Sequence, residues 1–385
     1  MAQFTAIFGF AFCFPFIPLF LAHDLGVHNA RDLALWTGVS GSATGLTSAV
    51  VSPLWGVLAD RYGRKSMLIR AMIGGGLSVT FLALARNPLE LVLLRALQGA
   101  ASGTVAATTT LVATGTPREH VGRAKGVISS AVALGSAVGP FAGGLAANYI
   151  PLRYVFLGGG ALLLIAVVPV VVGVKEAPVV RRVESGPTSM REVLRVAGPG
   201  TALAVAVLLL AQSLIQLSWS GGQPLVALRL LQLSPGSAAG VTGIAFAVAG
   251  IASAIAGIGY SRLAVSTGYR WLVALASILA AAALVLLGLA PTVVLVVIAT
   301  FLAGLGVGAA LPAISAMLGL ETPAEVQGRV FGLSASATAL GFGLGPLLAG
   351  TIAGVLSISV GLFTMAAVAL LLAAVVAFAA REPAR

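Results

Sequence analysis

Twelve long apolar stretches follow one another along the chain, with only short polar gaps between them. A helix needs about 20 mostly apolar residues to cross roughly 30 Å of hydrocarbon, and each stretch meets that requirement. Only 9% of the 385 residues are charged, whereas a soluble domain carries about a quarter. The sequence therefore predicts an all-α membrane protein with twelve transmembrane helices. The predicted spans are residues 4–24, 35–59, 66–86, 89–113, 122–148, 154–174, 199–229, 236–260, 269–289, 291–317, 328–355 and 358–380.

The first stretch is predicted to be a retained helix rather than a cleaved signal peptide. A cleaved signal has an apolar core of about 7–15 residues and usually a basic start. Here the apolar run extends from Phe4 to Ala22, and residues 1–3 include no basic side chain.

The Lys and Arg residues predict the orientation, because basic loops stay on the cytoplasmic side. With the N-terminus inside, the outer side holds only Arg31, Arg86, Arg153 and Arg229, and Arg95 lies within a span. We therefore expect both termini in the cytoplasm and the chain in the cell inner (plasma) membrane. The net charge of +11 then reflects this topology rather than nucleic-acid binding. The basic residues of the inner side are Arg61, Arg64, Lys65, Arg70, Arg118, Arg123, Lys125, Lys175, Arg181, Arg182, Arg191, Arg195, Arg262, Arg270, Arg329, Arg381 and Arg385.

The sequence offers no chemistry for an enzyme. Cys13 is the single cysteine, which excludes an intramolecular disulfide and a multi-cysteine metal site. No nucleophile–base set or phosphate-binding glycine loop is present, and the glycine clusters fall in or beside apolar spans. We expect no catalytic residue, no metal and no cofactor.

The sequence contains two copies of one pattern, which is an internal repeat. Shifted by about 205 residues, TPREHVGRAKG at 116–126 falls on TPAEVQGRVFG at 322–332. Pro18-Leu19 likewise falls on Pro224-Leu225. Internal repeats of this kind are typical of transporters whose halves rock about a site at the midplane. We predict an N-terminal six-helix bundle at 1–174, a cytoplasmic linker at 175–198 and a C-terminal six-helix bundle at 199–385.

The turn between the second and third spans carries a glycine, then an acid, then basic residues around a second glycine. This pattern resembles the signature loop of the major facilitator superfamily. The resemblance implies a gating role, in which the acid accepts hydrogen bonds from the start of the eleventh helix near 328–329. The alternative is a loop that only sets topology. The residues concerned are Gly56, Asp60, Arg61, Gly63, Arg64 and Lys65.

Arg95 is the one charge well inside a span, roughly 8 Å inward from Glu90 along the fourth helix. A buried arginine in a membrane needs partners and is by default a functional hypothesis. The segment resembles the fourth-helix motif of the family, whose arginine is implicated in proton coupling. The alternative is that Arg95 snorkels to the outer surface.

The fifth span contains small residues four apart followed by a proline, which lets helices approach closely and bends this one. It resembles the motif that marks the drug/proton antiporter branch of the superfamily. A near copy at 341–350 in the eleventh span leaves open that part of the signal is duplicated packing. The residues are Gly135, Gly139, Pro140, Gly143 and Gly144.

Taken together, the motifs resemble those of bacterial twelve-helix multidrug efflux transporters. That resemblance implies alternating access and export of small lipophilic compounds by proton antiport, with the small-molecule substrate, protons and membrane lipid as partners and the monomer as the working unit. A narrow exporter of a sugar or metabolite, or a uniporter, is the second possibility. A membrane receptor or scaffold is the third.

Every ionisable candidate lies in the first half, and no acid lies deep in any span. Asp24 is the best candidate to carry a proton, facing Arg95 across the first and fourth helices if the family packing holds. A helix-end cap is the alternative role for Asp24. With Arg95 as the single deep charge, the cavity should favour neutral, lipophilic or anionic compounds.

Polar residues on apolar helices usually point away from lipid, either into a cavity or toward a neighbouring helix. On the seventh helix, Gln212, Gln216 and Trp219 share one face. The predicted cavity candidates are Gln98, Gln212, Ser213, Gln216 and Trp219.

Overall fold

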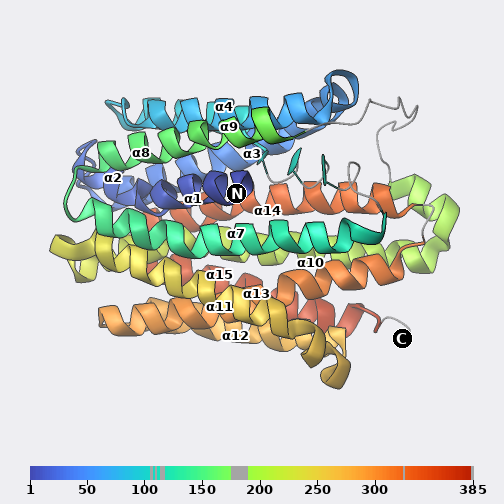
Figure 1. Ribbon diagram of the computed structural model, residues 1–385. Helices are drawn as coiled ribbons and strands as arrows, with labels where there is room; N and C mark the ends of the chain where they lie inside the picture. The colour runs from blue at the N-terminus through green and yellow to red at the C-terminus, as the bar shows by residue number, and fades with distance from the viewer. Residues whose placement is uncertain (105–106, 109–110, 113–117, 175–189, 324–325, 383–385) are drawn as a thin grey trace.

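The computed structural model describes residues 1–104, 107–108, 111–112, 118–174, 190–323 and 326–382. Across these ranges the chain is helical and contains no β-strand. The helices run side by side along one direction (Figure 1). This arrangement confirms the all-α class predicted from the apolar stretches.

The first half begins with a helix that is broken at Pro15, where a short 3-10 turn, η1 (Phe14–Phe16), separates α1 from α2. Proline cannot donate a backbone hydrogen bond, so the regular ladder is interrupted there. The remaining elements of this half are long helices joined by short turns. The helices are α1 (Ala2–Cys13), α2 (Ile17–His23), α3 (Ala30–Tyr62), α4 (Arg64–Leu82), α5 (Pro88–Ala101), α7 (Arg118–Ala147), α8 (Leu152–Ile165) and α9 (Val167–Gly173).

The second half repeats this pattern, but its first helix, α10, is continuous where the first half is broken at η1. Its first helix begins at Met190, so residues 190–198, which we predicted as the end of the linker, are already helical. Residues 175–189 of the predicted linker lie outside the described residues. The elements are α10 (Met190–Leu233), η2 (Pro235–Ser237), α11 (Ala238–Thr267), α12 (Tyr269–Leu289), α13 (Val293–Glu321), α14 (Gln327–Val355) and α15 (Ile358–Ala379).

Each helix pair of the first half has a counterpart in the second. α1 packs on α7 and α8 just as α10 packs on α14 and α15. The pairs α3 with α5 and α4 with α8 are likewise repeated by α11 with α13 and α12 with α15. The packing therefore carries the same internal repeat as the sequence.

Two seams join the halves: α14 lies along α3, and α7 lies along α11. In Figure 1, α7 crosses the centre of the view and α11 runs below it. The two seams are equivalent under the repeat, because α7 corresponds to α14 and α11 corresponds to α3.

The ends of the bundle differ in charge. We call one end the basic end: it holds the α3–α4 turn, the α11–α12 turn and the residues after α15. The other, called the opposite end, holds the loops at 24–29, 83–87, 148–151, 290–292 and 356–357. Both turns at the basic end use a glycine with positive φ, +92° at Gly63 and +81° at Gly268, a conformation that other residues adopt only with strain.

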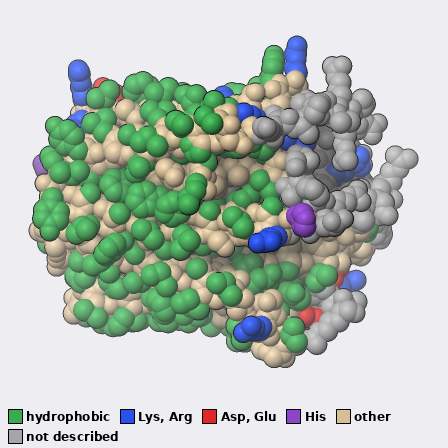
Figure 2. Space-filling model, viewed as in Figure 1, with side chains coloured by type: hydrophobic (Ala, Val, Ile, Leu, Met, Phe, Trp, Pro, Cys, Tyr) green, Lys and Arg blue, Asp and Glu red, His purple; other side chains and the backbone are tan. Residues whose placement is uncertain are grey.

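Nine helices of the described part are long and apolar enough to cross a membrane, so the chain is a multi-pass membrane protein. The other three predicted spans contain α3, α4 and α5. Of these, α5 covers only 14 residues within the described ranges. Apolar side chains cover the middle of the visible face, and Lys and Arg lie mainly toward its ends (Figure 2).

Candidate functional site

A cavity of about 1180 Å³ lies between the two halves. Its walls come from α1, η1, α2, α3, α5 and α7 of the first half and from α10, α11, α13 and α14 of the second. These are the helices that form or flank the two seams. A volume of this size holds a drug-sized ligand.

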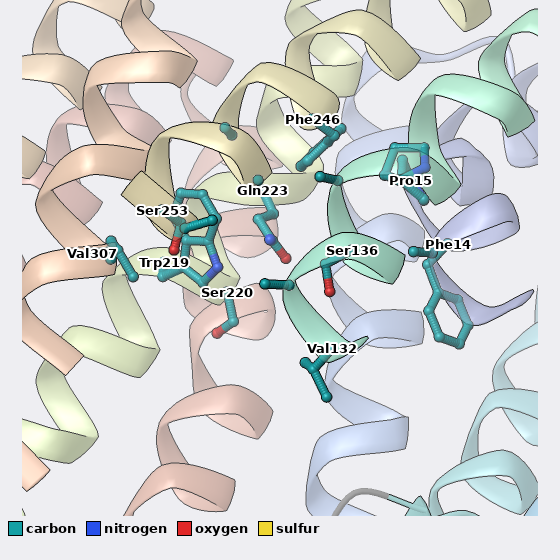
Figure 3. A pocket seen from close by; sticks show the side chains of 18 of the residues that line it. Phe14, Pro15, Val132, Ser136, Trp219, Ser220, Gln223, Phe246, Ser253 and Val307 are labelled. Carbon is teal, nitrogen blue, oxygen red and sulfur yellow. The ribbon is translucent and has the colours of Figure 1, made fainter. Parts of the chain in front are cut away.

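The lining is mostly apolar, with a few polar groups (Figure 3). Figure 3 shows Ser136 of α7 and Gln223 of α10 pointing into the space, with Trp219 and Ser220 beside Gln223. Phe246 and Ser253 of α11 complete that wall. An apolar space with sparse polar groups is typical of a small-molecule site.

Arg95 of α5 is the one charged residue among the described residues that line the cavity. Its side chain is 6% exposed. Nη1 donates to Oε1 of Gln98 at 2.6 Å and Nε donates to the backbone carbonyl of Ser40 at 3.4 Å. The guanidinium also lies 4.6 Å from the ring centroid of Phe14. Neutral groups therefore hold Arg95 without a carboxylate partner among the described residues.

Helix packing fixes this arginine in place. The hydroxyl of Thr44 on α3 donates to the backbone carbonyl of Arg95 at 2.9 Å. Gly99, one turn further along α5, has no room for a side chain against the backbone of Thr44. The close approach of α3 and α5 thus directs Arg95 into the cavity, and the predicted alternative of snorkelling to the outer surface is wrong.

Asp24 lies elsewhere, at the end of α2. Its Oδ1 is 3.4 Å from Nε of Arg153 on α8, and Arg153 also donates to the backbone carbonyls of Ala83 and Ala85. The predicted pairing of Asp24 with Arg95 is therefore wrong. The sequence indicates the true partner only weakly, because Arg153 follows a loop and resembles the other basic residues that set the membrane topology.

Partial burial raises the pKa of the Asp24 carboxyl, while Arg153 and then His23 act in the opposite direction. Desolvation disfavours the charged form of a carboxyl, and a nearby cation favours it. Asp24 therefore lies at the opposite end as a partly desolvated carboxyl in an ion pair.

Of the five predicted cavity candidates, Trp219 lies among the lining residues and the other four do not. Gln98 instead holds Arg95, and the amide of Gln212 donates to the hydroxyl of Thr338 on α14 at 3.2 Å. The backbone of Ser213 and the side chain of Gln216 face Gly341 of α14. The face of α10 that meets α14 thus carries these three residues.

The lining face of α10 begins at Trp219 and continues with Ser220, Gln223 and Pro224. Sequence reasoning missed Gln223, although it lies four residues after Trp219 and therefore on the same helical face. The sequence feature that could have identified Gln223 is its position directly before Pro224, which is one of the duplicated residues.

The signature loop closes the α3–α4 turn at the basic end. Gly63 ends α3 and starts α4 with its positive φ. Nζ of Lys65 donates to the carbonyl of Val171 on α9 at 2.8 Å, and Arg61 lies 5.4 Å from the ring of Tyr62. A side chain added at Gly56 would meet nothing within 4 Å, and Arg64 begins α4. Asp60 and residue 328, between which we predicted the gating contact, lie outside the residues whose side chains the structure describes.

The glycines of the fifth predicted span pack two ways. Gly135, Gly139 and Gly143 face α1, where an added Cβ would collide with Ile7, Ala11 and Phe12. Gly144 faces α11 instead, and its added Cβ would lie 2.8 Å from the Cα of Gly243. Pro140, inside α7, lines the cavity.

The near copy in α14 packs in the equivalent way. Gly341 and Gly345 face α10, whereas an added Cβ on Gly350 would lie 2.6 Å from the Cα of Gly38 on α3. Pro346 lines the cavity as Pro140 does. Both copies therefore serve close packing, mainly within their own half and, at Gly144 and Gly350, across the seams.

The close glycine contacts between the halves lie toward the opposite end and the middle of the bundle. They run from Gly144–Gly243 to Ala137–Gly250 on one seam. Beyond that level, a side chain added at Gly126 of α7 or Gly259 of α11 would meet nothing within 4 Å. Among the described glycines of α7 and α11, none nearer the basic end makes a close contact across this seam.

No group of three His, Cys, Asp or Glu that could hold a metal ion occurs in the part of the chain that the structure describes.

Comparison with known proteins identifies relatives over the whole chain. A family model described as Major Facilitator Superfamily matches residues 1–210 and again residues 208–385. The multidrug resistance protein MdtG of Escherichia fergusonii is 32% identical over 349 residues, covering 89% of this chain and 84% of that protein. MdtG of Escherichia coli O1:K1 is 31% identical over the same share of both chains.

Solved structures agree in fold at lower identity. A mutant of the nucleoside transporter NupG has a TM-score of 0.77 at 14% identity, covering 97% of this chain and 98% of that one. A bacterial homologue of the human lysosomal transporter Spinster, captured facing inward and occupied, has a TM-score of 0.75 at 17% identity and covers 98% and 95%.

Proposed function

This chain belongs to the major facilitator superfamily, and from that premise we propose that it exports small lipophilic compounds, neutral or anionic, by alternating access coupled to proton entry. The name of its relative MdtG supports multidrug efflux. The basic end then faces the cytoplasm, as the distribution of Lys and Arg favours. Both termini lie on that side of the cell inner membrane, and the two-halved chain works as a monomer.

The observation that carries the substrate class is Arg95 in the wall of the cavity. A buried cation held by neutral groups retains its attraction for an anion, and the low dielectric of the site strengthens it. A carboxylate or sulfonate headgroup would gain a charge-assisted hydrogen bond there, while the apolar walls accept its lipophilic part. A dication would meet only repulsion from the one charged wall residue that the structure describes.

Alternating access fits the two seams. The close glycine contacts between the halves lie toward the opposite end and the middle of the bundle, and this supports a state that opens toward the basic end. Rocking about the cavity would break the glycine contacts at the opposite end and form new ones at the basic end. We propose that the signature loop, with Gly56, Asp60, Arg61, Gly63, Arg64 and Lys65, governs that second closure.

A narrow exporter or uniporter remains the second candidate, and one observation favours it. No carboxylate is found among the described residues that line the cavity, and Asp24 is already paired with Arg153. Asp24 and Arg95 are the candidates for proton coupling. A flux experiment must distinguish transport coupled to protons through them from transport without protons.

The test is proton flux in proteoliposomes that hold an imposed pH gradient. Neutral, anionic and cationic lipophiles are added to the wild type, Arg95→Ala and Arg95→Lys. Thr300→Ala is the matched control, because Thr300 occupies the duplicated position in α13 and is equally buried. We expect substrate-triggered proton movement in the wild type and in the control.

Arg95→Ala should abolish that movement and weaken binding of the anionic compounds roughly tenfold to a hundredfold, because a charge-assisted hydrogen bond is worth about 1.5–3 kcal/mol. Arg95→Lys should retain part of the binding. Substrate flux without proton movement would support the uniporter, and preferential export of dicationic dyes would exclude the proposed substrate class.

A further inference from the structure

The guanidinium of Arg95 keeps hydrogen-bond donors that its described neighbours do not use. Nη1 donates to Oε1 of Gln98, and Nε donates to the backbone carbonyl of Ser40. A guanidinium carries more N–H groups than these two contacts occupy. The ring of Phe14 covers one face of the group, and Figure 3 shows Phe14 among the side chains around the cavity. Because Arg95 itself lines the cavity, its remaining N–H groups are available to a ligand there.

No carboxylate of the described residues balances this buried charge. The sequence has no acid deep in any span, and the described lining residues of the cavity include none. A charge in the hydrocarbon region of a membrane is costly, and such residues are found paired with other groups. The neutral oxygens of Gln98 and Ser40 stabilise the guanidinium but leave its net charge in place. An anion bound from solution would neutralise that charge.

Thr37 of α3 offers a second kind of donor in the same cavity. Its side chain is 2% exposed and lines the cavity, and its hydroxyl has no hydrogen-bond partner among the described residues. The carbonyl of Ser40, which accepts from Arg95, lies three residues further along α3. Residues three apart share one face of a helix, so the hydroxyl of Thr37 and the guanidinium of Arg95 belong to one wall. A buried hydroxyl without a partner favours a ligand that accepts its hydrogen bond.

The second half does not repeat this arrangement. Thr300 and Thr242 occupy the positions that correspond to Arg95 and Thr37 in the internal repeat. Thr300 carries no charge, and its hydroxyl donates to the backbone carbonyl of Val296 at 2.7 Å. The hydroxyl of Thr242 is buried and lacks a described partner, as that of Thr37 does, but Thr242 is not among the described lining residues. Thr242 is therefore a matched control for Thr37.

The chemistry of this wall selects a small monovalent anion. A guanidinium and a hydroxyl both donate hydrogen bonds, and one positive charge balances one negative charge. A divalent anion such as sulfate would bring an unbalanced charge between mostly apolar walls, which is unfavourable. A halide accepts hydrogen bonds from any direction, so it can bind N–H and O–H donors that come from two different helices.

We propose that a halide such as chloride binds in the cavity between the guanidinium of Arg95 and the hydroxyl of Thr37 when no substrate is bound. The halide neutralises Arg95 and satisfies Thr37. An anionic substrate displaces the halide when its headgroup reaches Arg95. This displacement rests on the proposed function, whereas the binding of the halide does not.

The test is the line width of the chloride NMR signal in solutions of the purified full chain in detergent. Chloride relaxes much faster when it is bound to a protein, so an occupied site broadens the signal. Sodium sulfate keeps the ionic strength constant, because the proposed site does not accept a divalent anion. We expect the wild type to broaden the signal, and we expect bromide to remove the added width by competition.

Four variants assign the broadening to this site. Arg95→Ala should remove it, and so should Gln98→Glu, because Oε1 of Gln98 lies 2.6 Å from Nη1 of Arg95 and a carboxylate there would replace the bound anion. Gln98→Glu keeps the test valid if Arg95→Ala does not fold. Thr37→Val should weaken chloride binding several-fold, whereas Thr242→Val should bind chloride like the wild type.

The thermal midpoint gives a second measurement, since a ligand that binds only the folded state stabilises it. Chloride should raise the midpoint of the wild type and of Thr242→Val more than that of Gln98→Glu. Equal line widths in the wild type, Arg95→Ala and Gln98→Glu would overturn the halide site, and equal weakening in Thr37→Val and Thr242→Val would overturn the role of Thr37.

These measurements need no transport, so they separate the halide site from the proposed function. An anionic lipophile that removes the chloride broadening would support both. Chloride binding that depends on Arg95 but is displaced by no anionic lipophile would support the halide site and tell against the proposed substrate class.

Discussion

At the scale of single residues, the surroundings of a charge decide what it can do. Arg95 and Asp24 are both ionisable groups of the first half, yet they lie in different places. Arg95 is held by Gln98, a backbone carbonyl and an aromatic face inside the cavity. Asp24 is bound to Arg153 at the opposite end. An ion pair that is partly exposed is worth only about 0–1 kcal/mol, so Asp24 is available for titration.

The pH dependence of stability should reveal the state of Asp24. Its pKa in the folded protein is raised by burial, so folding favours the protonated carboxyl. That contribution is fully present below the pKa of an unfolded aspartate, about 3.9, and is lost as the pH rises through the higher folded value. We expect the thermal midpoint of the wild type to fall across this window relative to Asp24→Asn, which cannot ionise.

The measurement is the thermal midpoint of both proteins in detergent from acid to neutral pH. At neutral pH the two should differ by less than about 1 kcal/mol. A variant clearly less stable than the wild type at neutral pH would show that the ion pair with Arg153 outweighs desolvation.

At the scale of helices, small residues decide which surfaces can meet. Gly350 of α14 and Gly38 of α3 lie back to back, as do Gly144 of α7 and Gly243 of α11. Lipid tails are as apolar as the surfaces of the helices, so the hydrophobic effect does not drive helices together within the membrane. Their association depends instead on such close packing. These glycines therefore stabilise the state in which the opposite end is closed.

Gly350→Val should shift the protein toward the state open at the opposite end. The new side chain cannot fit against Gly38, where even a Cβ would lie 2.6 Å from the Cα. Thr37→Cys in a Cys13→Ser background provides the readout, since Thr37 lines the cavity and is 2% exposed. Labelling by a membrane-impermeant thiol reagent added at the opposite side should increase.

Gly332→Val is the control for that experiment. It lies on the same helix, and an added Cβ there meets nothing within 4 Å, so it changes helix propensity without touching α3. Equal labelling in both variants would refute the role assigned to the Gly350 contact.

At the scale of the whole molecule, the two halves repeat one packing scheme around the cavity that lies between them. The seams are the only surfaces that alternating access must break, and in the described residues they are rich in glycine and proline. Under the proposed mechanism, transport depends on whether the halves can part at the opposite end.

A disulfide across one seam should stop transport reversibly. An added Cβ at Gly354 of α14 would lie 2.9 Å from Cγ of Leu35 on α3, a spacing that suits a cysteine pair. In a Cys13→Ser background, oxidised Leu35→Cys with Gly354→Cys should lose flux but still bind substrate from the basic end. Reductant should restore flux, and the two single-cysteine variants should respond to neither reagent. Flux that persists after complete cross-linking would argue against rocking of the halves.

Much of the fold could be predicted because its causes are local. Lipid requires each spanning segment to satisfy its own backbone, so a run of about 20 apolar residues already specifies a helix. The positive-φ turn at Gly63 and the kink at Pro15 follow from residue type. The helix α10 begins at Met190, before the apolar span that starts at residue 199, because a helix that extends beyond the apolar run leaves no hydropathy signal.

The sequence by itself determined the helices, the internal repeat, the family and the isolation of Arg95 from any deep acid. Only the tertiary structure decided which groups meet: Asp24 with Arg153, Gln212 with Thr338, and Gln223 with the cavity. These pairings depend on the rotation of each helix about its axis. Rotation is set by packing between helices far apart in sequence, such as Gly99 against Thr44, and hydropathy in a nearly uniform apolar helix does not record it.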